Sequence, residues 1–301
     1  MPQQQQYERA LAEGERAIAL DPNNADSYAF HGEVLRFAGR PEDALRMLAQ
    51  AMRLNPHAPP FYVFFLGLAY CETGRYTEAV ATLKEHLNRS PTNLAAHLNL
   101  ALSYVQQWAS QESADARTLA QALAAQRTIA LNESISWGHS IWGYVYLWQK
   151  QYEPALAEME RAIALAPNDA CNYVNLAETL SQAGRPEEGL RMIEQALRCK
   201  PPYADLHLAR VGNTYYLAGR TEEAIAPLQR FLTHYPKNLG AHLTLAAVYS
   251  ELGREAEAQA EATAVRRINP HFSLEVHRQR VPLKDPVWLE RHLTALRRAG
   301  L

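Results

Sequence analysis

Histidine is the residue type in this sequence that most suggests chemistry, because an imidazole can bind a metal ion or exchange a proton near neutral pH. The chain contains 11 histidines, and His97, His139 and His242 recur at one position of a repeating pattern. A metal site needs several ligands at characteristic spacing, and neither an HExxH motif nor a Cys/His ligand pattern occurs. We therefore predict that these histidines pack in the core or at its edge and that the chain binds no metal ion.

Cysteines and paired carboxylates are the other groups that could perform catalysis. Three cysteines, Cys71, Cys171 and Cys199, lie far apart without a CxxC motif, which indicates a reducing compartment and favours the cytoplasm. The pairs 42–43 and 187–188 are carboxylates at the start of predicted helices, where negative charge interacts favourably with the helix dipole. Because P-loop and GxSxG motifs are also missing, we predict no catalytic and no cofactor-binding residue.

Charge and hydropathy argue against nucleic acid and membrane as partners. The 301 residues carry a formal net charge of −2, from 30 basic and 32 acidic side chains, and no long run of like charge. The N-terminal sequence MPQQQQYERALAEG lacks an apolar stretch of signal-peptide length, and no 18 consecutive residues are apolar. A hydrophobic content of 48% is nevertheless ample for a continuous core.

Proline ends an apolar segment at a fixed interval along the chain. Successive prolines are 34 or 35 residues apart, except for one interval of 76 that holds two repeats if Glu133 takes the proline's place. The prolines are Pro22, Pro56, Pro91, Pro167, Pro201, Pro236 and Pro270. A fixed period of this length is typical of stacked supersecondary units, none of which can bury its apolar face alone.

Each repeat reads as a helical hairpin. In the first full repeat, residues 27–37 and 41–54 both show apolar residues at spacings of three and four, which predicts two amphipathic helices. Gly39 can terminate the first helix, and Pro41 suits the first turn of the second. Glycine recurs at the same turn at positions 74, 184, 219 and 253, so the interpretation does not depend on one repeat.

The repeats resemble the tetratricopeptide repeat family. The family signature of small and large residues appears in the first full repeat as Tyr28, His31, Gly32, Leu35, Ala44, Leu48, Ala51 and Pro56. It returns as Leu66, Gly67, Tyr70, Ala79, Leu83 and Pro91, and again as Val211, Gly212, Tyr215, Ala224, Leu228 and Pro236. The resemblance implies an all-α, right-handed superhelical solenoid whose first helices line the concave side, and in this family the three recurring histidines occupy a packing position.

We predict three segments on this basis. An N-terminal half repeat covers residues 1–22, the solenoid covers 23–270 and a C-terminal cap covers 271–301. The seven repeats are placed at 25–56, 60–91, 94–133, 136–167, 170–201, 205–236 and 239–270. The third repeat departs from the signature at Thr128 and Glu133, and its eight extra residues near 106–116 are expected to form a mobile polar loop around Trp108.

Two repeats are so alike that an internal duplication is expected. Residues 25–56 and 170–201 share 16 identities in 32 aligned positions. Arg46-Met47 and Arg191-Met192 agree although they lie outside the family signature. The alternative is that any two repeats of this family look alike, and the agreement outside the signature favours duplication of several hairpins together.

The C-terminal segment is expected to close the solenoid. Ser273 and Asp285 look like helix N-caps, and Pro286 suits the first turn of the final helix. The tail, with FSLE, KDP and a final LRRAGL, also resembles the C-terminal tetratricopeptide regions attached to bacterial class III adenylate or guanylate cyclases and winged-helix regulators. That resemblance implies a regulatory or interaction role and no catalysis, because no cyclase or winged-helix segment is present.

One first helix is unusual, since the stretch PFYVFFLGLAYC at 60–71 is apolar all round. Such a helix is either wholly buried or has a partner. In the family, four positions of each first helix line the concave groove, and here the middle repeats carry apolar and aromatic residues there. The predicted groove residues are Phe61, Phe64, Leu68, Leu98, Leu102, Trp137, Tyr144, Leu147, Asn213 and Tyr216.

Two explanations of this apolar groove stay open. The aromatic side chains could pack on neighbouring second helices or be covered by the chain's own tail. Alternatively, an apolar peptide or amphipathic helix, from another protein or another copy of this chain, lies across the second to fourth repeats. The family's carboxylate clamp for acidic C-termini is disfavoured, because Asn213 alone fits it.

We therefore predict a non-catalytic scaffold for protein–protein interaction, and the alternative is an unfamiliar enzyme or small-molecule-binding protein built on a helical solenoid. An enzyme should show an enclosed pocket with converging polar groups and perturbed pKa values, whereas a scaffold should show an open groove.

Overall fold

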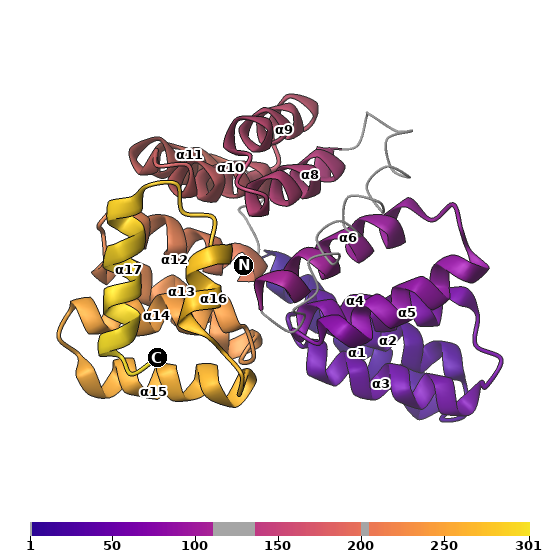
Figure 1. Cartoon of the computed structure of the whole chain (residues 1–301). Coiled ribbons are helices and arrows are strands. Elements are labelled where there is room, and N and C mark those ends of the chain that lie inside the picture. The colour runs from indigo at the N-terminus through magenta and orange to yellow at the C-terminus, as the bar shows by residue number, and fades with distance from the viewer. Residues whose placement is uncertain (1, 111–135, 200–204) are drawn as a thin grey trace. The chain divides into compact units, whose positions relative to one another are not determined.

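The computed structural model describes residues 2–110, 136–199 and 205–301, and all regular secondary structure in these ranges is helical (Figure 1). The chain divides into two compact units, Met1–Ser103 and Tyr104–Leu301. We describe each unit by itself. The helical-hairpin solenoid expected from the sequence is confirmed.

The N-terminal unit consists of a lone helix followed by paired helices. Helix α1 (Pro2–Leu20) packs on α2, as expected for a half repeat. The hairpins are α2 (Ala25–Phe37) with α3 (Pro41–Leu54) and α4 (Pro60–Glu72) with α5 (Tyr76–Arg89). Helix α6 (Leu94–Ala109) begins the third repeat and continues past Ser103, where this unit ends. Buried Leu35, Ala44, Leu48 and Tyr62 form the core between the first two hairpins.

Each turn between paired helices uses the same chemistry. Gly39 adopts a φ of 73°, and the backbone N–H of Arg40 donates to the carbonyl of Leu35 at 2.9 Å, which terminates α2. Arg40 Nε then donates to the Asp43 carboxylate at 2.6 Å. The glycine, the arginine and the carboxylate three residues later recur in four other hairpins. These sets are Gly74, Arg75 and Glu78; Gly184, Arg185 and Glu188; Gly219, Arg220 and Glu223; and Gly253, Arg254 and Glu257.

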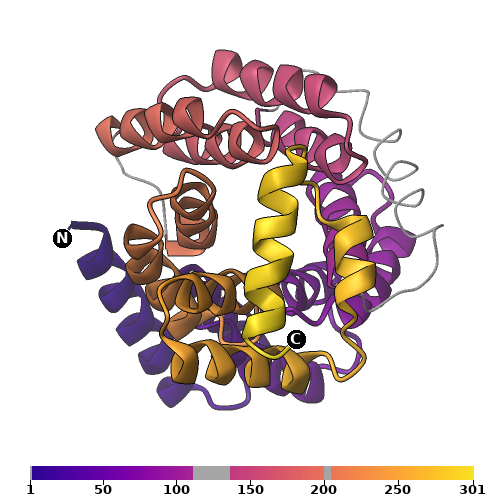
Figure 2. The same cartoon turned by 60° about the vertical axis from the view of Figure 1, so that its left-hand side comes forward.

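In its described residues the C-terminal unit contains four hairpins and a cap, drawn from pink to yellow in Figure 2. Its hairpins are α8 (Ser136–Trp148) with α9 (Tyr152–Leu165), α10 (Ala170–Gln182) with α11 (Pro186–Arg198), α12 (Leu208–Leu217) with α13 (Ile225–His234), and α14 (Leu239–Glu251) with α15 (Glu255–Ile268). Short 3₁₀ turns, Asp205–His207 and Glu222–Ala224, precede α12 and α13. Pro227 explains the second of these, because its ring removes a backbone donor and clashes with the preceding turn.

The turn between α8 and α9 departs from the glycine rule. Lys150 occupies the glycine's place with a φ of 60°, and it is the non-glycine residue with positive φ among the described residues. Its neighbour Gln151 still donates a backbone hydrogen bond to Tyr146 at 2.9 Å, so the turn keeps its geometry. A residue with a Cβ atom is strained in this conformation.

Close helix contacts explain the small residues of the signature. A Cβ atom added at Gly212 would lie 2.5 Å from Cγ of Leu228 and 3.1 Å from the carbonyl oxygen of Ala224. At Gly32 the nearest atom would be Cγ of Leu48, at 3.1 Å. Paired helices therefore cross with their backbones close together at these glycines, as the repeat pattern predicts.

The C-terminal cap consists of α16 (Leu274–Arg280) and α17 (Pro286–Arg298). The predicted N-caps are confirmed, because Ser273 accepts from the N–H of Val276 at 3.3 Å and Asp285 accepts from that of Val287 at 2.8 Å. Leu293 and Leu296 of α17 are fully buried, and the helix packs on α14. The cap is thus part of the core of the C-terminal unit.

The sequence prediction was wrong about where the insertion in the third repeat begins. Helix α6 continues to Ala109, so Gln106 and Trp108 are helical and do not begin a loop. The segment LAAHLNLALSYVQQWA contains no glycine or proline that would end the helix earlier. The rest of the predicted insertion, and the second helix of that repeat, lie outside the described residues.

Candidate functional site

Four phenylalanines of the N-terminal unit form an aromatic surface, which we define as Phe30, Phe61, Phe64 and Phe65. Phe30 of α2 stacks on Phe61 of α4 with a centroid distance of 5.4 Å and lies edge-on to Phe65 at 6.3 Å. Phe61 and Phe65 meet edge to face at 5.6 Å. Despite these contacts Phe30 keeps 55% of its surface exposed. The aromatic surface therefore presents a large apolar group to solvent on two neighbouring first helices.

The sequence of α4 explains why this surface is aromatic. The helix is apolar all round, but its packing face holds only the buried residues Tyr62, Val63, Gly67, Leu68 and Ala69. Its remaining phenylalanines are half-buried. Helix α4 thus packs on α2, α3 and α5 but is not wholly buried, and its phenylalanines remain partly exposed.

The predicted groove residues of the N-terminal unit differ in accessibility. Phe61, Phe64 and Leu102 are half-buried, whereas Leu68 and Leu98 are buried. The Phe64 ring lies 5.2 Å from that of His86 on the second helix α5, which corresponds to the alternative of packing between helices. The sequence reasoning did not single out Phe30 or Phe65, although both stand at the sixth position of their first helices.

A charged cluster lies at the other end of the same helices. Arg36 donates to both carboxylate oxygens of Glu33 at 2.8 Å and also pairs with Glu72. Oε2 of Glu72 is buried without a hydrogen-bond partner among the described residues, and burial raises the pKa of Glu72 to about 7 although Arg36 lowers it. Burial raises the pKa of the Cys71 thiol to about 12, so this cysteine is a poor nucleophile near neutral pH.

The predicted groove residues of the C-terminal unit are mostly covered. Trp137 is 40% exposed and Asn213 is half-buried. Tyr144, Leu147 and Tyr216 are buried. The role of the ten predicted groove residues in binding stays a prediction, but the structure limits direct contact by a ligand to those that reach the surface.

Tyr144 belongs to a polar network on the first helices α8, α10 and α12. Its hydroxyl lies 2.9 Å from Oε2 of Glu178 and accepts a hydrogen bond from Arg210 Nε. Arg210 Nε is 3.3 Å from Glu178 Oε2, and Asn213 Nδ2 donates to Oε1 of the same carboxylate at 3.2 Å. Burial raises the pKa of Tyr144 well above its usual range, so the hydroxyl remains protonated.

The sequence reasoning found Tyr144 and Asn213 but missed Glu178 and Arg210. Both stand on first helices, where the family resemblance places groove residues. A carboxylate and a guanidinium on neighbouring first helices were therefore a signal that could have been noticed. His207, whose Nδ1 lies 3.5 Å from Arg210, has its pKa lowered to about 3 by burial and by that cation. The network therefore consists of a neutral imidazole, a neutral phenol and one ion pair.

The cap covers Tyr216. The Tyr216 hydroxyl lies 3.4 Å from Nδ1 of His292, and its ring meets that of Trp288 edge to face at 5.8 Å. Both contact residues belong to α17. Tyr216 therefore corresponds to the alternative in which the chain's own tail covers an aromatic groove residue. Arg291 of α17 also pairs with Glu251 at the end of α14.

The three recurring histidines contact a glutamate carboxylate on the second helix of their hairpin or a preceding backbone carbonyl. His139 Nδ1 lies 2.6 Å from Oε2 of Glu158, and His242 Nδ1 lies 2.5 Å from Oε2 of Glu261. His97 Nε2 lies 2.8 Å from the carbonyl oxygen of Pro91. Among residues 2–110, 136–199 and 205–301, no three His, Cys, Asp or Glu side chains are grouped to hold a metal ion.

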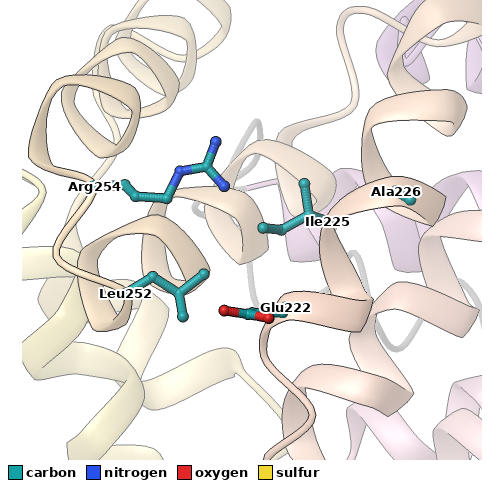
Figure 3. Close-up of a pocket in the computed structure, with 5 residues that line it drawn as sticks. All are labelled: Glu222, Ile225, Ala226, Leu252 and Arg254. Atoms are coloured by element: carbon teal, nitrogen blue, oxygen red, sulfur yellow. The ribbon is translucent and has the colours of Figure 1, made fainter.

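A pocket of about 420 Å³ lies between α13 and the turn that joins α14 to α15 (Figure 3). Glu222, Ile225, Ala226, Leu252 and Arg254 line it. Arg254 is the turn arginine of its hairpin and pairs with Glu257. None of the ten predicted groove residues lines this pocket.

The helices of the described segments are too short or too polar to cross a membrane. This finding agrees with the absence of long apolar stretches in the sequence.

Comparison with known proteins places these features in a family context. Over an alignment of 217 residues, this chain is 22% identical to superkiller protein 3 of Schizosaccharomyces pombe. The alignment covers 71% of this chain but only 15% of that protein. The thermophilic TPR protein TTC0263 of Thermus thermophilus matches with a TM-score of 0.55 and 24% identity, over 63% of this chain and 98% of that one.

A chain of the Cut9–Hcn1 hetero-tetramer of the APC/C matches over 98% of this chain and 53% of its own length, with a TM-score of 0.57 and 17% identity. At these identities the structural likeness shows the fold alone. The tetratricopeptide repeat pattern itself matches residues 35–101, 146–211 and 215–278, which is more than half of the chain. With glycine turns, close helix crossings and a 34-residue period in place, this chain belongs to the tetratricopeptide repeat family.

Proposed function

We propose that this chain is a non-catalytic scaffold that binds an apolar or amphipathic peptide segment of another protein on the aromatic surface of its N-terminal unit. Proteins of the tetratricopeptide repeat family generally mediate protein–protein interactions, which supports the general role. The proposal includes a regulatory or interaction role in a larger bacterial signalling assembly of the cytoplasm, and this part rests on the resemblance of the tail and on cysteine usage alone.

The observation that carries the proposal is the exposure of Phe30. A phenylalanine that stacks on a neighbour and still exposes 55% of its surface leaves a flat apolar face in water. Exposed aromatic clusters of this kind mark interaction surfaces more often than scattered single residues do. Half-buried Phe61 and Phe65 extend the face along α4, so a partner helix would meet several rings at once.

The free energy gained by burying these rings is of the size expected for a reversible complex. Full burial of one aromatic or leucine side chain contributes about 1.5–3 kcal/mol. Two or three such contacts give about 3–9 kcal/mol before the cost of association, so the rings alone support weak binding and a micromolar complex needs further contacts along the partner segment. In this proposal the buried Leu68 and Leu98 of the N-terminal unit pack within the solenoid and do not contact the partner, and the exposed Trp137 stays a predicted contact residue of its own unit.

Site-specific photo-crosslinking in cells tests the proposal, and α2 offers a matched control. Phe30 and Phe37 lie on the same helix with 55% and 57% of their surfaces exposed. Phe37 lies outside the aromatic surface, beneath the Arg36 guanidinium at 4.3 Å. We expect benzoyl-phenylalanine at position 30 to crosslink to an apolar or amphipathic segment of another protein, and the same probe at position 37 to give little product.

A second change makes the test specific for the surface. Phe61→Ala removes the ring on which position 30 stacks, so the crosslink at position 30 should fall several-fold while helicity is unchanged. Equal crosslinking at positions 30 and 37, or a crosslink that survives Phe61→Ala, would contradict the proposal. If the probe crosslinks the chain to another copy of itself, the aromatic surface serves self-association, and the proposed partner from another protein is wrong.

A further inference from the structure

The cap lies across the ends of three successive first helices. The backbone N–H of Lys284 donates to the carbonyl of Gln182, the last residue of α10, at 2.9 Å. Farther along, Tyr216 of α12 contacts Trp288 and His292, and Glu251, the last residue of α14, pairs with Arg291. Residues 284–292 thus bridge α10, α12 and α14 within the C-terminal unit.

Two buried histidines join the two cap helices to each other, and one of them also contacts Tyr216 of α12. Nε2 of His277 on α16 lies 3.1 Å from Nε2 of His292 on α17, and both residues are less than 10% exposed. Two imidazoles can share such a contact only when one nitrogen carries a proton and the other does not. The pair is therefore compatible with neutral rings and incompatible with two fully protonated ones.

The surrounding contacts assign a direction to every proton. Tyr216 can donate its single hydroxyl proton to Glu251 Oε1, 3.2 Å away. Nδ1–H of His292 then donates to the Tyr216 oxygen at 3.4 Å, which leaves Nε2 of His292 as the acceptor for Nε2–H of His277. A proton on Nε2 of His292 would remove the acceptor for Nε2–H of His277, and a proton on Nδ1 of His277 would create a buried imidazolium with no carboxylate within hydrogen-bond distance among the described residues.

We propose that α16 and α17 form a latch over the first helices of the C-terminal unit, closed by the neutral His277–His292 pair and opened when this pair takes up a proton. This inference does not depend on the proposed function of the aromatic surface. Opening uncovers Tyr216 and frees the ends of α10, α12 and α14.

The charged groups around the pair do not compensate an imidazolium. Glu251 is engaged by Arg291 and receives the Tyr216 hydroxyl, and Glu290 of α17 pairs with Arg278 of α16. Burial lowers the pKa of His277 to about 3, to which His292 adds, and burial lowers that of His292 to about 4. An open cap restores ordinary imidazoles with a pKa near 6.5, so acidification favours opening.

Hydrogen exchange on the full chain, followed by mass spectrometry at pH 7.5 and pH 5, tests the latch. Protection factors are corrected for the intrinsic exchange rate at each pH, and α17 is compared with α10 of the same unit. We expect protection of α17 to fall about thirtyfold relative to α10 between pH 7.5 and pH 5 if one histidine takes up the proton. Helices α17 and α10 belong to the same unit, so a general loss of stability caused by protonation of His207 lowers the protection of both and cancels in their ratio.

Two variants separate the latch from a general loss of stability. His277→Phe with His292→Phe retains ring volume without titration, and α17 should stay equally protected at both pH values. Tyr216→Phe leaves both histidines in place, so protection of α17 should fall about tenfold already at pH 7.5 and fall again at pH 5. A wild-type ratio that does not change with pH, or an equal fall in the double variant, would overturn the proposal.

Discussion

The hydroxyl oxygen of Tyr144 lies 2.9 Å from Oε2 of Glu178, and each residue belongs to a different hairpin. Arg210 of the next hairpin closes the group, with Nε 3.3 Å from the same carboxylate oxygen and its guanidinium 4.9 Å from the centre of the Tyr144 ring. Three successive first helices are therefore tied together by one ion pair and one phenol. Side chains of Arg210 and Glu178 are only 21% and 14% exposed, so solvent screens the pair weakly.

Removal of one ionic partner should destabilise the C-terminal unit more than removal of both. Arg210→Met leaves Glu178 charged and nearly buried, and we expect a loss of about 2–4 kcal/mol in the free energy of unfolding. The double variant Arg210→Met with Glu178→Gln keeps neutral hydrogen bonds and should recover most of that loss. Chemical denaturation of the two variants checks this, and equal losses would show that the charges do not couple.

Two helices of the C-terminal unit cross closely at Gly189. A Cβ atom there would lie 2.7 Å from the carbonyl oxygen of Ala177 and would also meet the Ser181 hydroxyl. Gly189→Ala should therefore lower the free energy of unfolding by about 1–2 kcal/mol, despite the better helix propensity of alanine. Gly240→Ala is the matched control, because its Cβ would meet only Asn238 Oδ1 at 3.5 Å, and it should be neutral or stabilising by about 0.5 kcal/mol. Thermal unfolding distinguishes the two directions.

Lys150 offers a stabilising substitution. It adopts a φ of 60° where five other hairpins use glycine, a conformation that costs a residue with a Cβ atom about 1–2 kcal/mol. Lys150→Gly should raise the free energy of unfolding by up to about 1 kcal/mol after the extra entropy of the unfolded chain is subtracted. The converse change, Gly184→Ala, should destabilise by about 1 kcal/mol, because no atom lies within 4 Å of the added methyl group and only the backbone is strained. A Lys150→Gly variant that melts earlier than the wild type would argue against this account of the turn.

The two units should respond to acid in opposite directions. The pKa values of His277 and His292 are lowered in the folded chain, so their contribution is complete above pH 6.5 and is lost as pH falls toward 4. The pKa of Glu72 is raised to about 7, so the N-terminal unit gains stability as pH falls from 7 toward 4.5. Between pH 7.5 and pH 5 the change in stability amounts to about 2 kcal/mol for Glu72 and about 2 kcal/mol for each of the two histidines.

Hydrogen exchange measured at several pH values reports the stability of each unit separately. Glu72→Gln should remove the gain in stability of the N-terminal unit on acidification, leave the opposing loss from His31, whose pKa burial lowers, and leave the response of the C-terminal unit unchanged. If both units weaken in parallel at pH 5, general charge repulsion rather than these buried groups controls acid stability.

The repeat, the hairpins and the caps could be predicted from the sequence because their causes are local. Gly39 and Pro41 act within one turn, Ser273 and Asp285 cap the helices that follow them, and apolar spacing sets the packing face of each helix. The same local reasoning placed the start of a loop at Gln106, where an unbroken helix continues.

Contacts between distant repeats were beyond prediction. Glu178 meets Tyr144 across 34 residues, and Tyr216 meets His292 across 76. Whether Tyr216 faces a partner or the chain's own tail depends on how successive hairpins rotate and on where the cap returns. Helix pattern and capping fix only which face of a helix is apolar, whereas the neighbour of that face follows from the summed crossing angles of all the hairpins between them.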